Sequence, residues 1–166
     1  FDSSLVELQP FVANLGSDLS NDALHLQYFI TENTSPTPAA LGDFAKADLL
    51  MRQLKYAEAL AQFDEIVRRN PASLLVDDAT LKIGELHLLL NQVNDAVGAF
   101  QHIVNDMPES ILRDRAQMRT AEVYQTVIKD KAKAIAAYEQ ILAKFPNSLY
   151  VVEARKRIRQ LRGDSI

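Results

Sequence analysis

Three segments of the chain align without a gap: residues 59–71 (ALAQFDEIVRRNP), residues 96–108 (AVGAFQHIVNDMP) and residues 134–146 (AIAAYEQILAKFP). Each begins with Ala, has an aromatic residue at its fifth position and Ile at its eighth, and ends with Pro. Apolar residues at three- and four-residue intervals form one stripe of an α-helix. Because Pro lacks an N–H donor and disfavours helical angles in the residue before it, each segment predicts a helix that ends at its proline.

The match continues beyond each proline. Ser follows two residues later, an aliphatic residue three later and Ala eight later, in blocks that begin at Pro71, Pro108 and Pro146. A serine just after a helix end is suited to cap the next helix. That next helix carries a small residue in every copy, namely Ala47, Gly84 and Ala121. The chain therefore contains a two-helix unit repeated at 37 and then 38 residues.

Nine helices are expected from the apolar periodicity. They lie near residues 3–15, 20–31, 38–53, 56–69, 74–90, 93–106, 111–128, 131–144 and 149–162. A small residue in the first helix, followed by Ala, an aromatic residue, an aliphatic residue and Pro in the second, resembles the tetratricopeptide repeat. The resemblance covers roughly residues 40–162. It implies an all-α fold, an α-solenoid (right-handed superhelix) of antiparallel helix pairs.

The sequence departs from the shortest form of that repeat. About three extra residues follow each proline, and the third unit has one more near Lys129–Lys133. The family's large aromatic residue early in the first helix is replaced by Asp43, Thr80 and Gln117. The longer Pro-x-Ser unit resembles repeats of bacterial cell-envelope proteins. This likeness favours a fragment of a larger bacterial protein, located in the periplasm or at the envelope rather than in the cytoplasm.

The repeats divide the chain into five expected parts. These are an N-terminal helical cap or degenerate repeat (1–36), repeat 1 (37–73), repeat 2 (74–110), repeat 3 (111–148) and a C-terminal capping helix (149–166). The sequence NTSPTP at residues 33–38 marks the first boundary. The cap is expected to pack through Leu5, Val6, Leu8, Val12, Leu15, Ala23, Leu24, Leu26, Tyr28, Phe29 and Ile30. Alternatively, it is the tail of further repeats in a longer chain.

In the resembled family the first helix of each pair lines a concave groove. Carried over by position, the groove residues are Phe44, Asp48, Met51 and Arg52 in repeat 1, Asp78, Leu81, Glu85 and Leu88 in repeat 2, and Arg115, Met118, Glu122 and Gln125 in repeat 3. Glu153 and Lys156 extend this row.

Two sets of groove residues recur at 37-residue spacing. Phe44, Leu81 and Met118 form an apolar row, while Asp48, Glu85 and Glu122 form an acidic row. Together they favour a protein or peptide partner that is basic or amphipathic. The alternative is a plainly solvated face, on which Asp48 pairs with Arg52 one turn later.

Composition narrows the function classes further. The net charge of −4 argues against a nucleic-acid binder, and the absence of Cys excludes disulfides and thiolate metal sites. No apolar run is long enough to span a membrane. His25, His87 and His102 do not have metal-ligand spacing, and no phosphate-binding or catalytic motif occurs. We therefore expect no enzyme activity, metal or cofactor.

Five cations crowd the last helix, at Arg155, Lys156, Arg157, Arg159 and Arg162. We interpret them as complementing the dipole at the end of a helix that stops at Gly163, although an acidic partner, anionic lipid or nucleic acid would also attract them. The sequence thus predicts a protein-interaction scaffold of undefined oligomeric state. A small enzyme or ligand-binding domain on a helical frame is the alternative.

Overall fold

The computed structural model describes residues 1–13, 18–34, 38–71 and 73–164. Within these ranges every regular element is a helix, which confirms the all-α prediction. The elements are α1 (Asp2–Ala13), α2 (Asp18–Asn33), α3 (Pro38–Arg52), α4 (Tyr56–Arg69), α5 (Val76–Leu89), α6 (Val93–Asp106), α7 (Arg113–Val123), the π-helical turn η1 (Tyr124–Ile128), α8 (Lys131–Lys144) and α9 (Val151–Arg162). The bounds of α4, α6 and α8 are those predicted from the sequence.

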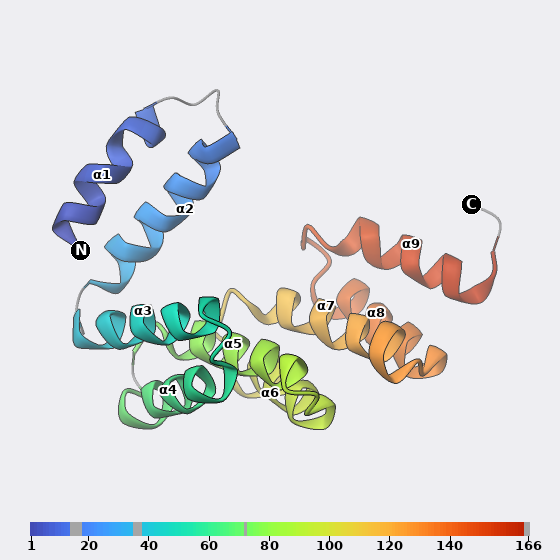
Figure 1. Ribbon diagram of the computed structural model, residues 1–166. Coiled ribbons are helices and arrows are strands. Elements are labelled where there is room, and N and C mark those ends of the chain that lie inside the picture. Colours follow the sequence, from blue (N-terminus) through green and yellow to red (C-terminus); the bar gives the residue numbers. More distant parts are fainter. Residues whose placement is uncertain (14–17, 35–37, 72, 165–166) are drawn as a thin grey trace.

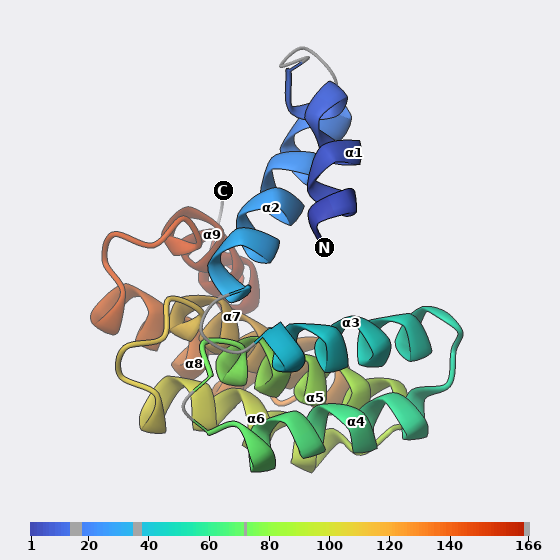
Figure 2. The same ribbon diagram turned by 90° about the vertical axis from the view of Figure 1, so that its left-hand side faces the viewer.

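The helices stack in chain order. From α3 to α9 each helix packs against the next, so the pairs α3–α4, α5–α6 and α7–α8 lie side by side (Figure 1). The hairpin α1–α2 stands away from this stack and contacts it mainly through the end of α2 (Figure 2). This arrangement is an α-solenoid, in which each pair buries its apolar surface against its neighbours.

The three prolines occupy equivalent bends. Pro71, Pro108 and Pro146 each lie in a turn after a second helix, and the next helix begins five residues later. In the bend after Pro108, the Ser110 hydroxyl accepts a hydrogen bond from the N–H of Leu112 at 3.1 Å, and the other two bends have the same bond. Because this N–H belongs to the residue before the helix, the serine closes the turn. The prediction that it caps the helix itself is corrected accordingly.

The repeated positions of the second helices form the core. The aromatic residues Phe63, Phe100 and Tyr138 are fully buried, and the repeated Ala and Ile positions around them expose at most 2 % of their surface. Burying such side chains is the main source of stability for a fold of this kind. The stripe that the sequence predicts therefore corresponds to the inward side of α4, α6 and α8.

Gly84 allows α5 and α6 to approach closely. A Cβ at this position would lie 2.4 Å from Cε1 of Phe100, whose ring is fully buried and cannot swing away. We expect Gly84→Ala to lower the free energy of unfolding by about 1–2 kcal/mol, because overpacking outweighs the gain in helix propensity. Gly98→Ala in α6 is the matched control, since a Cβ there has no neighbour within 4 Å. Urea denaturation in which both variants gain stability would contradict this account of the helix contact.

The extra residue of repeat 3 lies earlier than expected. Leu54, Asn91 and Lys129 end the first helices in the same left-handed conformation, with φ near 60°. The register shift therefore arises before Lys129, in the π-helical turn η1, where the N–H of Asp130 bonds the carbonyl oxygen of Tyr124 at 2.9 Å. A π-turn accommodates one added residue without ending the helix, so the placement near Lys129–Lys133 was wrong.

The two ends of the chain differ in packing. Ala23 and Ile30 of α2 are buried as expected, whereas Val6 of α1 is 71 % exposed and α1 has no fully buried residue. Three parts of the prediction lie outside the described residues. They are the core position Leu15, the end of the first helix near it, and residues 35–37 at the first boundary. At the other end, α9 buries its predicted stripe through Ala154 and Ile158.

Candidate partner-binding face

The predicted groove residues lie on α3, α5 and α7 and on the continuation of α7 in η1. Met51 and Leu88 are half-buried and pack against the core, so they offer a partner only part of their surface. The residues of the set with exposed or half-buried polar side chains define what we call the first-helix face: Asp48, Arg52, Asp78, Glu85, Arg115, Glu122 and Gln125. Their contact with a partner stays a prediction.

The predicted apolar row is not on the surface. Phe44, Leu81 and Met118 expose only 6 %, 3 % and 5 % of their surface. The ring of Phe44 packs between Phe29 of α2 and Phe63 of α4, at centroid distances of 5.2 and 5.1 Å. Leu81 and Met118 lie in the core between successive helix pairs. The prediction of an exposed apolar row is therefore wrong, because neighbouring helices cover these positions.

The carboxylates of the acidic row are paired with cations. Asp48 accepts a hydrogen bond from Nε of Arg52 at 2.7 Å, as the solvated alternative predicts. Lys82 lies 3.7 Å from Asp48 and 3.8 Å from Glu85, and Arg115 lies 3.8 Å from Glu85. These five residues form a charge ladder that runs from α3 across α5 to α7. A row of alternating sign is not a free acidic surface, so it gives no general preference for basic peptides.

Repeat 3 continues the pairing with different residues. Nη1 of Arg119 donates to Glu122 at 2.7 Å, and the guanidinium lies over the ring of Phe100 at 6.0 Å. The Tyr138 hydroxyl donates to Oε1 of Gln125 at 2.6 Å, and burial raises the pKa of this tyrosine to about 12. Two of the predicted groove residues thus hold other side chains in place, which limits their freedom to meet a partner.

Asp78 is the most perturbed acid of the first-helix face. Burial raises the pKa of its carboxyl to about 6, and the nearby carboxylates of Asp77 and Glu32 act in the same direction. The cations of Arg115 and Lys82 lower it only in part. Glu32 belongs to α2, so the end of the N-terminal hairpin approaches the repeats here. Ionising the carboxyl of Asp78 in the folded protein therefore costs free energy.

A pocket that the sequence did not reveal lies between the hairpin α1–α2 and α3. This hairpin pocket has a volume of about 260 Å³ and a mostly apolar lining. Its lining includes Phe1, Leu26, Phe29, Leu41, Phe44 and Asp48. Because Asp48 also belongs to the charge ladder, the pocket opens at one end of the first-helix face. Residues 1–36 lack the repeat pattern, so no spacing in the sequence could have located it.

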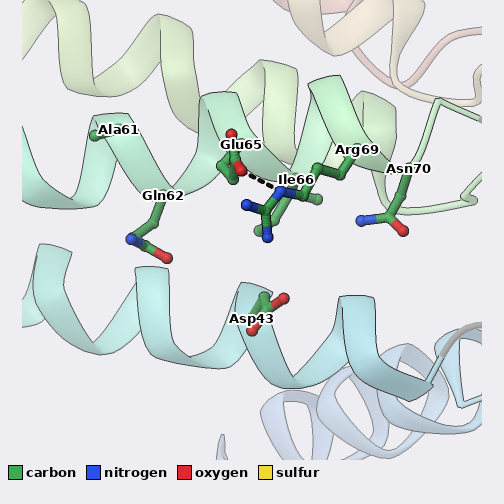
Figure 3. Close-up of a pocket in the computed structure, with 7 residues that line it drawn as sticks. All are labelled: Asp43, Ala61, Gln62, Glu65, Ile66, Arg69 and Asn70. Atoms are coloured by element: carbon green, nitrogen blue, oxygen red, sulfur yellow. Dashed lines mark ion pairs between the residues drawn. The ribbon is translucent and has the colours of Figure 1, made fainter.

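A polar cleft lies on the other side of α3, against α4. It has a volume of about 310 Å³, and Figure 3 shows Asp43 of α3 facing the residues of α4 that line it. Its charged residues have partners on their own helices: Glu65 pairs with Arg68 and Arg69, and Asp43 pairs with Lys46 at 3.0 Å. Such pairing leaves no poised acid or base, so the cleft gives no support to the enzyme alternative.

The histidines have ordinary surface roles. Nδ1 of His87 lies 2.7 Å from Oε1 of Gln92, and Nδ1 of His102 lies 2.8 Å from Asp106. Within the described ranges no three His, Cys, Asp or Glu side chains are grouped so as to hold a metal ion. Nor does any helix of those ranges have the length and apolar character needed to cross a membrane.

Stacked helix pairs with a charged first-helix face are typical of the class of α-solenoid interaction scaffolds. Family models for the tetratricopeptide repeat match residues 44–109 and 115–148. The chain belongs to the tetratricopeptide repeat family, whose repeats form scaffolds for protein–protein interaction. No curated protein matches the chain with significance.

Proposed function

We propose that the chain binds an amphipathic segment of a partner protein along the first-helix face, with one apolar side chain of that segment anchored in the hairpin pocket. The observation that carries this proposal is the continuity between the two features. Asp48 lines the pocket and also belongs to the charge ladder, where it pairs with Arg52 and Lys82. A single bound segment can therefore use both at once.

The hairpin pocket supplies the apolar part of the binding energy. Its volume of about 260 Å³ exceeds the cavity of about 150 Å³ that holds a benzene ring in a protein interior. A Leu or Phe side chain fits such a space. Burying one apolar side chain contributes about 1.5–3 kcal/mol, which makes it the natural anchor of a bound segment.

The charge ladder fixes the position of the bound segment along the first-helix face. Its cations and carboxylates alternate from Arg52 to Arg115, so a segment with charges of both signs matches it better than a uniformly basic or acidic one. A uniformly charged peptide would meet like charges at every second position. The partner is therefore an amphipathic segment of mixed charge.

A peptide selection followed by binding measurements tests this proposal. Peptides are selected from a random display library against the chain, and their affinity is measured by fluorescence anisotropy. We expect selected peptides to share an apolar residue flanked by charges of both signs, and Ala45→Glu at the mouth of the pocket to weaken their binding at least tenfold. Ala45 lines the pocket and is exposed.

Ala61→Glu is the matched control, because Ala61 is an exposed alanine of α4 that lines the outer polar cleft (Figure 3). It should leave binding unchanged. Equal affinities for the wild type and Ala45→Glu, or a selection without any apolar anchor, would refute the proposed site. If Ala61→Glu weakened peptide binding instead, the binding surface would lie at the polar cleft between α3 and α4.

We also propose an envelope-associated location in a bacterium. The support is the longer repeat unit with its Pro-x-Ser bend, present three times at Pro71, Pro108 and Pro146. Immunodetection in fractionated source cells is expected to find the protein in the periplasmic or membrane fraction. Recovery in the cytosol alone would contradict this location without affecting the proposed binding site.

A further inference from the structure

Charge is distributed unevenly between the two ends of the solenoid. Residues 1–45 contain no Lys or Arg but six acidic residues, whereas residues 151–162 contain five cations and one Glu. The chain as a whole has a net charge of −4. The acidic N-terminal hairpin and the cationic α9 are therefore electrostatically complementary surfaces at opposite ends of the chain (Figure 1).

One face of α9 is exposed and packs against no other helix of the described residues. Val152, Arg155, Lys156 and Arg159 recur at intervals of three and four residues, so they lie on one side of the helix. All four are exposed, Val152 to 76 %, and they line a shallow, largely apolar hollow of about 240 Å³. The arginine stems supply much of its apolar surface. We call this the α9 face.

In the preceding repeats the equivalent positions pack against the second helix of the pair. Gly84 meets Phe100 of α6, and Nε2 of Gln117 donates to the carbonyl oxygen of Ala137 in α8 at 2.9 Å. Counted from the prolines, Arg159 stands where Gly84 does and Arg155 where Gln117 does. The α9 face thus occupies positions that contact a second helix in the preceding repeats. It carries guanidinium groups there, where those repeats have small or neutral residues.

The two arginines at these positions are exposed and have no ion-pair partner among the described residues. Lys156 pairs with Glu153 at 3.8 Å, Arg157 pairs with Glu153 at 2.6 Å, and Arg162 pairs with Glu139. Arg155 and Arg159 make no side-chain ion pair or hydrogen bond with any described residue. A guanidinium binds a carboxylate in a bidentate manner, so each of the two can receive one carboxylate of an opposing helix.

Helix α1 has the complementary composition. It has no fully buried residue, and Val6 and Phe11 expose 71 % and 46 % of their surface. Asp2 lies one turn before Val6 and Glu7 one turn before Phe11, and both carboxylates are exposed. Among the described residues neither has an ion-pair partner. Residues five apart in a helix point about 140° apart, so Val6 and Phe11 lie on different sides of α1. The outer side of α1 therefore presents Val6 between the carboxylates of Asp2 and Glu7.

We infer that α1 of one copy docks on the α9 face of a second copy, so that the protein associates head to tail. Val6 would cover the hollow beside Val152, and Asp2 and Glu7, which flank Val6 on either side of the helix, would meet Arg155 and Arg159. Because the two surfaces differ, each copy keeps one surface of each kind free after pairing. Such a heterologous contact extends into a chain of subunits or closes into a ring.

Sedimentation velocity over a range of protein concentrations tests this association. At low ionic strength the weight-average mass of the wild type is expected to rise with concentration. Raising the salt from about 50 mM to about 500 mM should weaken association roughly tenfold or more, because exposed charges are screened. A wild type that stays monomeric at all concentrations in low salt would overturn the inference.

Charge reversal at each end provides the decisive experiment. The double variants Asp2→Lys/Glu7→Lys and Arg155→Glu/Arg159→Glu should each be monomeric alone, because their two docking surfaces then carry like charge. Mixed in equal amounts, they should associate again, since each surface of one variant is complementary to a surface of the other. Recovery on mixing also shows that both variants are folded.

A matched control places the same charge change on the neighbouring helix. Lys131 and Lys144 are exposed cations of α8, so Lys131→Glu/Lys144→Glu should associate as the wild type does. A mixture of the two reversed variants that remains monomeric would overturn the inference, as would association of either variant alone. Neither outcome bears on the proposed hairpin pocket, which Ala45→Glu tests separately.

Discussion

Replacing Phe100 with Ala is expected to lower the free energy of unfolding by about 3–5 kcal/mol, the range found for buried Phe. Phe100 is fully buried in the cluster that joins α5, α6 and α7. It also fills the space beside Gly84, where no side chain can replace the lost ring. The resulting cavity would weaken the centre of the stack, and because each pair depends on its neighbours, α5 to α7 should open together.

Urea denaturation followed by circular dichroism measures this loss. Phe11→Ala is the control, since Phe11 is 46 % exposed on α1 and its truncation should change stability by less than about 0.5 kcal/mol. Amide hydrogen exchange should show faster opening of α5, α6 and α7 in the Phe100 variant. A loss for Phe100→Ala no larger than that for Phe11→Ala would refute the assignment of Phe100 to the core.

Asp78→Asn is expected to stabilise the protein at pH 7.5 by on the order of 2 kcal/mol. The pKa of Asp78 is about 6 in the folded protein, mainly because of burial, and is near its ordinary value of 3.8 when the chain unfolds. The folded state therefore binds a proton more readily than the unfolded state. Its contribution to stability is most unfavourable above pH 6 and improves as the pH falls towards 4. Asn has the same shape and no charge.

The difference between variant and wild type, measured from pH 7.5 to pH 4.5, isolates this carboxyl from all other titrating groups. The two stabilities should converge as the pH falls through 6 towards 4.5. Asp77→Asn is a less suitable comparison, because Asp77 accepts a hydrogen bond from Ser110 at 2.6 Å. Asp95→Asn in the first turn of α6 is the better control, because Asp95 is exposed and its replacement should not reproduce the gain in stability at pH 7.5. A pH-independent effect of Asp78→Asn would refute the burial argument.

Local chemistry accounts for how well the repeats were predicted. The bounds of α4, α6 and α8 follow from an apolar stripe that stops at Pro71, Pro108 and Pro146, and both signals act within a single helix. The close approach beside Gly84 was also visible, since a small residue recurs there in every unit. These features need no knowledge of distant parts of the chain.

The candidate site was predicted less well. The position of Phe44 on α3 is correct, but its burial depends on Phe29 of α2 and Phe63 of α4, which periodicity along one helix cannot place. The acidic row was likewise inferred from the positions of residues on each helix taken separately. The pair of Lys82 with Glu85 lies within α5, but the approach of Lys82 to Asp48 of α3, and of Arg115 of α7 to Glu85, depends on how the helices stack.

The amino-acid sequence alone specifies the helix pairs, their order and their membership of the tetratricopeptide repeat family, because these depend on spacing within about 37 residues. Three features emerge only when the helices are assembled: the exposure of each groove residue, the hairpin pocket, and the lack of a described ion-pair partner for Arg155 and Arg159. The physical reason is that burial and charge pairing are properties of neighbours in space. The periodicity of a helix follows from its own residues, whereas the surface that covers the helix belongs to other parts of the chain.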